Sequence, residues 1–333
     1  MRASSVLSFA SLAAALVACS SSGSHPGPGT DAGDAGDSAS PGADATAEAG
    51  QDTGTGSDAP GDAPGDAGPV LQTYVRVADW SPDVASFDFC VAPQGTSDWE
   101  GPILAIAAAL EPDAGSLGDG GVDGLTFPEV TEYLPLLPGA YDVRLVAASA
   151  TDCSVGIAPD ATGLPALATS AHSTIAVVGD SGVAGSDAPL TIEVLTDDAA
   201  PPAAGGFALR FINAVPSLPT VSFGEGSLAK KTFAPLFTGV AFGAAGTQGE
   251  SDAGVVDGNG YLSLAALSGD LSVVASGATT DTATAPGVSF GGGQVVTVAA
   301  VGGKTHGSIP PELIACTDNA SPVGLLTSCV VNP

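Results

Sequence analysis

Apolar and polar side chains alternate along several short segments that follow residue 70. Every second residue is apolar in segments such as Phe87-Phe89-Val91, Tyr141-Val143-Leu145-Ala147 and Leu190-Ile192-Val194. Charged residues occupy the positions between them, namely Asp88, Arg144 and Glu193. A period of two is the period of a β-strand that buries one face. These segments therefore predict strands whose charged residues point away from the apolar face.

The strand pattern occurs twice along the chain. Residues 74–89, "YVRVADWSPDVASFDF", align without a gap with residues 208–223, "ALRFINAVPSLPTVSF", so that Arg76 matches Arg210. Three further pairs of segments correspond in the same order: 133–149 with 261–277, 173–180 with 295–303, and 195–201 with 316–322. The chain therefore contains two copies of one unit of about 120 to 130 residues.

Each copy is predicted to hold about seven short strands, separated by turns rich in Pro, Gly and Asp. This pattern indicates an all-β chain with two tandem immunoglobulin-like antiparallel β-sandwich domains. We place repeat 1 at residues 70–202, repeat 2 at residues 203–323 and a C-terminal tail at residues 324–333. The 46 Gly and 26 Pro of the chain favour the same class, because they suit short strands and turns better than long helices.

The N-terminus has a different pattern. Arg2 precedes an apolar core from Val6 to Val17, which is typical of a secretory signal and too short for a stable transmembrane helix. The sequence Leu16-Val17-Ala18-Cys19 resembles the lipobox of bacterial lipoproteins, in which a peptidase cuts before a lipidated cysteine. The resemblance implies that residues 1–18 are a signal peptide and that Cys19 carries the lipid. The alternative is an ordinary signal, after which Cys19 is lost or left free.

Residues 19–69 form a linker between the signal peptide and repeat 1. From Ser20 to Gly68 the chain has nine acidic residues, no Lys or Arg, and no aromatic or large aliphatic side chain. Such an acidic Gly/Ala/Asp segment has too little apolar surface to offset its ordering entropy, so we expect it to be disordered. Its composition and length suit a flexible spacer, and weak calcium binding is the alternative.

The charge balance limits the possible partners. Seven Lys and Arg stand against 36 Asp and Glu, which gives a net charge of -29. Nucleic acid is also polyanionic and would be repelled, so we expect no nucleic-acid partner. The densest basic site is Lys230-Lys231, which we interpret as a solvated turn or edge.

The cysteines predict two disulfides. If Cys19 is lipidated, Cys90, Cys153, Cys316 and Cys329 remain, and an even number in an exported protein suggests pairing. Four cysteines allow three pairings, and the repeats favour Cys90–Cys153 and Cys316–Cys329. The second bridge would hold the C-terminal tail against the last strand. A zinc site is the alternative, but no CxxC spacing or cluster of histidines supports it.

No set of residues predicts catalysis. The sequence "GDSG" at Gly179–Gly182 is similar to the nucleophile segment of chymotrypsin-like proteases. Those enzymes need a histidine far upstream in a folded barrel, whereas His172 lies only seven residues before the segment and His25 lies in the linker. We interpret it as a turn after a strand. The acidic loops 113–124 and 257–260 do not complete a calcium-binding EF-hand pattern and are interpreted as surface loops. We therefore expect no catalytic residue, no metal ligand and no cofactor.

Aromatic residues offer one further alternative. Trp80, Trp99 and Tyr74 could form a platform on which a carbohydrate stacks. Aromatic residues are only 5% of the chain, and such residues more often pack in cores and turns. We therefore expect these three to be packing residues.

Two motifs of repeat 1 resemble a known family. The segments "VRVADWSPDVASFDFCV" and "FPEVTEYLPLLPGAYDVRLV" are similar to the bacterial domain of unknown function 4397, in which a V-R-V, S-P-D motif precedes a Y-L-x-L-P-x-G-x-Y motif. The resemblance covers residues 70–202 and, less closely, 206–323. Repeat 2 has Val215-Pro216-Ser217 instead of Ser-Pro-Asp, and Asp79 stands where the family often has histidine. The resemblance implies an exported, surface-attached β-sandwich of the myxobacterial lipoprotein type, often duplicated and without an established reaction.

These observations together predict a non-enzymatic lipoprotein. We expect it to be exported and anchored through its N-terminal lipid to the outer membrane of a Gram-negative bacterium. Its two sandwiches would serve a structural or adhesive role toward a surface glycan or protein. The alternative is a ligand-binding module for glycan, peptide or calcium.

Overall fold

The structure is a computed structural model that describes part of the chain. The described residues are 71–110, 124–181, 188–198, 200–202, 204–247, 254–303, 309–319 and 329–331. Residues Leu71–Pro333 form one compact unit. The predicted signal peptide, Cys19 and the linker 19–69 lie outside the described residues.

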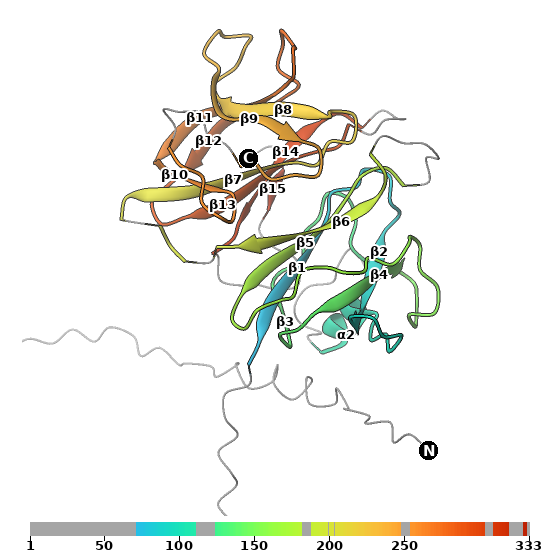
Figure 1. The fold of residues 1–333 in the computed structure, drawn as a ribbon. Helices are drawn as coiled ribbons and strands as arrows, with labels where there is room; N and C mark the ends of the chain where they lie inside the picture. The colour runs from blue at the N-terminus through green and yellow to red at the C-terminus, as the bar shows by residue number, and fades with distance from the viewer. Residues whose placement is uncertain are drawn as a thin grey trace, which may run out of the picture. The chain divides into compact units, whose positions relative to one another are not determined.

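Repeat 1 contains two sheets and one short helix (Figure 1). The larger sheet has the strand order β3-β1-β5-β6, with strands β3 (Leu134–Leu136), β1 (Thr73–Asp79), β5 (His172–Val178) and β6 (Thr191–Asp197). The smaller sheet pairs β2 (Phe87–Pro93) with β4 (Tyr141–Ala147). Helix α2 (Ile103–Leu110) follows β2 in the chain.

Repeat 2 also contains two sheets. One has the order β10-β7-β13-β14-β15, with strands β10 (Tyr261–Ala265), β7 (Gly206–Asn213), β13 (Val295–Val301), β14 (Glu312–Thr317) and β15 (Val330–Val331). The other has the order β12-β11-β8-β9, with strands β12 (Ala283–Phe290), β11 (Leu267–Ala275), β8 (Thr220–Glu225) and β9 (Ala234–Ala241). Strand β15 belongs to the predicted C-terminal tail and pairs with β14.

The same pairing pattern occurs in both repeats. Strand β1 pairs antiparallel with β3 and parallel with β5, and β7 pairs in the same way with β10 and β13. The prediction of an all-β fold is confirmed, and most strand pairs are antiparallel as expected. The two parallel pairs differ from that prediction. Parallel neighbours need a long connection, and the segment between β1 and β5 provides one because it contains β2, α2, β3 and β4.

Each repeat has its own apolar core between its two sheets. In repeat 1, Val75 and Val77 of β1 share the core with Phe87 and Phe89 of β2. In repeat 2, the ring of Phe211 on β7 stacks on that of Phe223 on β8, with ring centroids 4.3 Å apart. Both repeats are therefore two-layered sandwiches.

A third apolar cluster joins the two repeats. Repeat 1 contributes Ala78, Trp80, Val130, Ala176 and Val178, and repeat 2 contributes Ile212, Ala214, Ala299, Val301, Ile314 and Cys316. These residues lie on the faces of the two larger sheets that point away from each repeat's own core. We call this cluster the inter-repeat layer. Figure 1 shows the consequence, with β1, β5 and β6 lying between β2–β4 and the strands of repeat 2.

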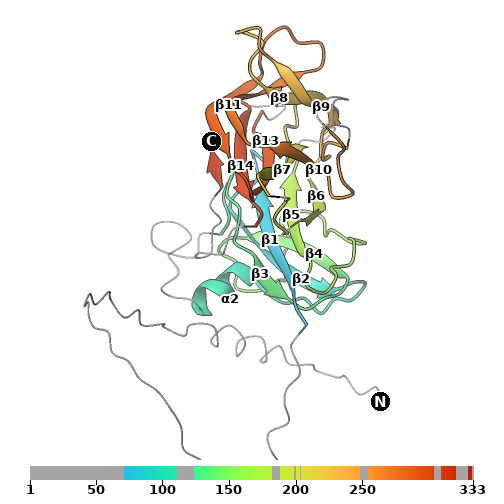
Figure 2. The ribbon, with the colours of Figure 1, turned by 90° about the vertical axis from the view of Figure 1, so that its left-hand side faces the viewer.

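The inter-repeat layer buries four strands on both faces. Every side chain of β13 is buried, and nearly every side chain of β1, β5 and β7 is buried too. Strands buried on both faces often have nearly continuous apolar sequences, because neither face meets water, and β13 is of this kind. In the view turned by 90°, α2 lies at the end of the unit away from β8, β9 and β11 (Figure 2).

Helix α2 is the main local feature that the strand pattern did not predict. Its sequence "ILAIAAAL" consists of residues with good or tolerable helix propensity. Asp88 on β2 receives the backbone N–H groups of Leu104 and Ala105, each at 2.9 Å, and so caps the first turn. Asp88 does point away from the core as predicted, but it is fully buried because α2 covers it. In the described part of the chain, no helix has the length and apolar character needed to cross a membrane.

Candidate functional site

Eight polar side chains meet beside the inter-repeat layer, of which seven are buried and one, Tyr133, is half-buried. Repeat 1 contributes Arg76, Tyr133, Thr174 and Asp197, and repeat 2 contributes Arg210, Tyr261, Thr297 and Asp318. We call this group the Arg–Asp cluster. Both arginines and both aspartates are essentially inaccessible to solvent, with at most 1% of each side chain exposed.

Strand alternation places the arginines in the cluster. Val75 and Val77 point into the core of repeat 1, so Arg76 between them points toward repeat 2. Strand register places Thr174 directly beside Arg76, and on the equivalent strands it places Thr297 beside Arg210. The two repeats therefore bring equivalent residues to the same position on equivalent strands.

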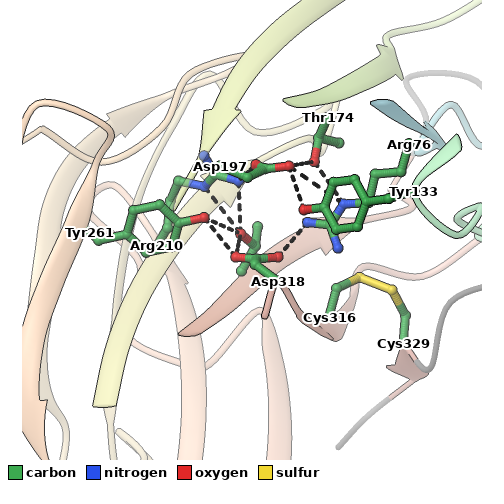
Figure 3. The surroundings of a disulfide bond; sticks show 10 residues. Arg76, Tyr133, Thr174, Asp197, Arg210, Tyr261, Cys316, Asp318 and Cys329 are labelled. Carbon is green, nitrogen blue, oxygen red and sulfur yellow. Dashed lines mark hydrogen bonds and ion pairs between the residues drawn. A yellow bond between two sulfur atoms is a disulfide. The ribbon is translucent and has the colours of Figure 1, made fainter. Parts of the chain in front are cut away.

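Two ion pairs cross between the repeats, and a third, longer contact joins Arg76 Nε to Asp197 Oδ2 at 3.8 Å within repeat 1 (Figure 3). Arg76 of repeat 1 donates through Nη2 to Asp318 of repeat 2. Arg210 of repeat 2 donates through Nη2 to Asp197 of repeat 1. Each repeat therefore supplies one cation and one anion, and receives one of each from the other.

The threonines connect the charges within each repeat. The Thr174 hydroxyl accepts a hydrogen bond from Arg76 Nε at 2.8 Å and donates one to Asp197 Oδ2 at 2.6 Å. The Thr297 hydroxyl accepts from Arg210 Nε at 3.1 Å and donates to Asp318 Oδ2 at 2.6 Å. The hydroxyls thus link the two cross-repeat pairs into one network.

The tyrosines close the network on two sides. The Tyr133 hydroxyl donates to Asp197 and the Tyr261 hydroxyl donates to Asp318, both at 2.7 Å. Each ring also lies under a guanidinium, with Arg76 above Tyr133 at 4.9 Å and Arg210 above Tyr261 at 4.6 Å. Burial raises the pKa of both tyrosines far above the usual value, so they act as neutral donors.

The two carboxyl groups have different electrostatic surroundings. Burial acts to raise the pKa of Asp197, but the nearby Arg210 and Arg76 outweigh it and leave the pKa below its ordinary value. Burial also raises the pKa of Asp318, and the attraction of Arg76 does not fully offset it because the Asp197 carboxylate is close. Asp318 is therefore the carboxyl of the cluster that takes up a proton first as the pH falls.

Residues 73–224 match the profile of a family described as a domain of unknown function (DUF4397). This part of the chain belongs to that family. The match runs from β1 to β8, so the DUF4397 region includes Arg76, Asp197 and Arg210 but ends before Asp318. No curated protein matches the chain.

The Ser-Pro-Asp motif of the DUF4397 region holds the "GDSG" segment in place. The Ser81 hydroxyl donates to the Gly179 carbonyl at 2.6 Å, and Asp83 Oδ1 accepts the Ser181 backbone N–H at 2.8 Å. The Ser181 hydroxyl itself donates to the Asp83 carbonyl at 3.0 Å. The turn predicted at this position is therefore tied to the end of β1, and the serine hydroxyl is used as a structural donor.

Asp79 is a buried carboxyl next to this motif. Its Oδ1 accepts the Ser81 backbone N–H at 3.2 Å, and its Oδ2 has no hydrogen-bond partner among the residues that the structure describes. Burial raises the pKa of Asp79 to about 8, the Ser81 N–H lowers it in part, and the carboxyls of Glu129 and Asp83 raise it further. Asp79 is therefore neutral in the folded DUF4397 region at neutral pH.

Both predicted disulfides form. Cys90–Cys153 lies on the face of β2 opposite to the core, in a small cluster with Val146 and Trp99. Cys316–Cys329 lies in the inter-repeat layer beside the Arg–Asp cluster, two residues before Asp318 (Figure 3). The second bridge connects β14 to the segment that begins β15, so it fixes the tail as expected. Cys19 lies outside the described residues.

The structure does not bring the three aromatic residues of the proposed platform together. Trp80 is fully buried in the inter-repeat layer, and Tyr74 stacks on His172 with ring centroids 4.8 Å apart. Trp99 lies under the guanidinium of Arg144 at 4.2 Å. All three therefore pack against protein groups, as the packing interpretation predicted.

The acidic loops provide no assembled cation site in the described regions. Asp257 Oδ1 accepts the backbone N–H groups of Asn259 and Tyr261, each at 2.9 Å, and so stabilises a turn. Residues 113–123 of the other loop lie outside the described residues. Among the residues that the structure places, no group of three or more His, Cys, Asp or Glu could hold a metal ion. Lys230 pairs with Asp270 at the surface, and Lys231 has a left-handed φ of 57° in a turn.

Sequence reasoning missed the Arg–Asp cluster, although the signal was present. Arg76 and Arg210 coincide in the repeat alignment, and the aligned "TDD" and "TDN" segments contain Asp197 and Asp318. A charged residue inside an apolar strand, repeated at the same position in both copies, is unusual because burying a charge is costly without a partner. That combination could have predicted a buried pair, but not that the pairs cross between repeats.

Proposed function

We propose that this protein is an exported, lipid-anchored envelope protein whose two sandwiches act as one rigid, non-enzymatic head with a structural or adhesive role. In this proposal Cys19 carries the lipid, the linker 19–69 is the spacer, and the outer membrane of a Gram-negative bacterium is the anchoring site. The two sandwiches, which we expect to be immunoglobulin-like, are displayed beyond the spacer.

The fusion of the two sandwiches through the Arg–Asp cluster is the observation that carries this proposal. Four charged residues of the interior hold the repeats together: Arg76 and Arg210 each pair with an aspartate of the other repeat. Such an arrangement suits a protein that must keep a fixed shape at the end of a flexible spacer. The disulfides Cys90–Cys153 and Cys316–Cys329 support export, because such bridges persist in oxidising compartments.

The lipid anchor is tested with Cys19→Ala in the full-length chain. We expect the wild-type protein to sediment with membranes and to begin with an acylated Cys19 when its N-terminal peptide is analysed by mass spectrometry. Cys19→Ala should lack the acyl mass and should not appear as a mature protein in washed outer membranes, because several acyl chains are needed for durable attachment. Ser22→Ala, which leaves the lipobox intact, is the matched control and should behave as wild type.

The anchoring proposal is wrong if the mature wild-type protein begins elsewhere than at Cys19. It is also wrong if a processed Cys19→Ala protein remains in the membrane fraction. Treatment of intact cells with protease then tests whether the two sandwiches lie on the cell surface. If they do, the protease should cut the linker and release the sandwiches from the cells.

A further inference from the structure

The surface that each repeat presents to the other has the same design. Repeat 1 offers Arg76 on β1 and Asp197 at the end of β6, and repeat 2 offers Arg210 on β7 and Asp318 just after β14. The arginine of each repeat binds the aspartate of the other. An interface in which residue i meets residue j, and j meets i, is the isologous type found in two-fold symmetric dimers.

The apolar contacts also come from equivalent positions of the two repeats. Ala78, Ala176 and Val178 of repeat 1 occupy the strand positions held in repeat 2 by Ile212, Ala299 and Val301. All six are aliphatic and buried in the inter-repeat layer. The surface of either repeat is therefore complementary to another copy of itself in both charge and apolar character.

We propose that this surface also docks on a second copy of this chain, so that two chains can dimerise by exchanging repeats. In the exchanged dimer, repeat 1 of one chain docks on repeat 2 of the other, and every contact of the Arg–Asp cluster is kept between chains.

Two further observations make exchange feasible. Each repeat has its own core and its own disulfide, so neither needs the other to complete its sandwich. The connection between β6 and β7 is limited to residues 198–205 and contains Pro201 and Pro202. Only this connection must change its path for exchange, and short connections between domains favour swapping.

The test uses two charge-inverted variants of the mature chain. Asp318→Arg places two arginines opposite each other within one chain, and Arg76→Asp places two aspartates there. Each variant keeps the Arg210–Asp197 pair, but positions 76 and 318 carry like charges and cannot pair within one chain. When the two variants are expressed together, exchange gives one native interface, Arg76 with Asp318, and one inverted interface, in which the two new residues pair.

We expect the coexpressed variants, distinguished by mass, to give a 1:1 heterodimer as the main folded species in native mass spectrometry. Each variant expressed alone should give no folded dimer, because positions 76 and 318 then carry like charges both within and between chains. The single-chain double variant, Arg76→Asp with Asp318→Arg, should restore a folded chain, because the inverted pair then forms internally. This double variant shows whether Arg76 and Asp318 can exchange their charges and still form an ion pair at this site.

The matched control inverts a pair that does not cross between repeats. Arg144 and Asp160 form a partly exposed ion pair within repeat 1. Coexpressed Arg144→Asp and Asp160→Arg should give no heterodimer. The proposal is overturned if the Arg76 and Asp318 variants remain separate or insoluble when coexpressed while the double variant folds. It is equally overturned if the double variant fails to fold, since the charges would then not be interchangeable.

Discussion

At the scale of single residues, buried carboxyl groups of this protein differ in whether a cation pairs with them. Asp197 and Asp318 each receive a guanidinium and at least one hydroxyl, so their desolvation is offset by pairing. Among the residues that the structure describes, Asp79 receives only the Ser81 N–H, and no cationic group acts on it. A carboxyl in that position avoids the cost of a buried charge by keeping its proton, which raises its pKa to about 8.

The unpaired burial of Asp79 predicts a pH dependence of stability. An unfolded aspartate has a pKa near 3.8, so between about pH 4 and about pH 8 the folded state binds a proton that the unfolded state has lost. Stability from this residue is therefore fully present below pH 4 and falls by about 1.4 kcal/mol per pH unit across that window. Asp79→Asn, which is neutral at every pH, should become progressively more stable than wild type from pH 4 to 8.

The measurement is the free energy of unfolding in urea at several pH values. The difference between Asp79→Asn and wild type should be small at pH 4 and should level off above pH 8. Asp98→Asn, at an exposed position of the same repeat, is the control and should show no such trend. A constant difference across the range would show that Asp79 is not the titrating group.

At the scale of elements, the pattern of the sequence predicted some strands better than others. Alternation identified β2 and β4, because only one face of each lies on the core of repeat 1. Strand β13, "VVTVAAV", does not alternate, because its second face lies on the inter-repeat layer. Which surface covers that face depends on contacts between distant parts of the chain, which local periodicity does not contain. The burial of Asp88 was missed for a similar reason, because α2, which covers it, follows β2 only after an intervening turn.

The contact between Asp88 and the first turn of α2 can be tested by mutation. Asp88→Ala removes the acceptor for the N–H groups of Leu104 and Ala105, so the first turn loses its cap. We expect the free energy of unfolding to fall by about 2 kcal/mol. Asp88→Asn keeps an acceptor oxygen and should lose less. Urea denaturation at constant pH gives both values, and equal stability of Asp88→Ala and wild type would exclude a capping role.

At the scale of the whole molecule, the inter-repeat layer joins two sandwiches that each have a complete core. Trp80, the largest buried side chain, comes from repeat 1 but packs with residues of repeat 2. Both cross-repeat ion pairs, Arg76–Asp318 and Arg210–Asp197, would also break if the repeats separated, and the apolar inter-repeat layer would be exposed to water. The two repeats should therefore unfold together.

Hydrogen exchange can test whether the unit unfolds cooperatively. The amides of β5 in repeat 1 and of β13 in repeat 2 lie on strands buried on both faces, so they should exchange only through global unfolding and with the same free energy. Asp88→Ala acts on α2, at the end of repeat 1 away from repeat 2, and should lower the protection of β13 as much as that of β5. Asp98→Asn should leave both unchanged. If Asp88→Ala lowers the protection of β5 alone, the repeats open independently, and the Arg–Asp cluster connects two separate folding units.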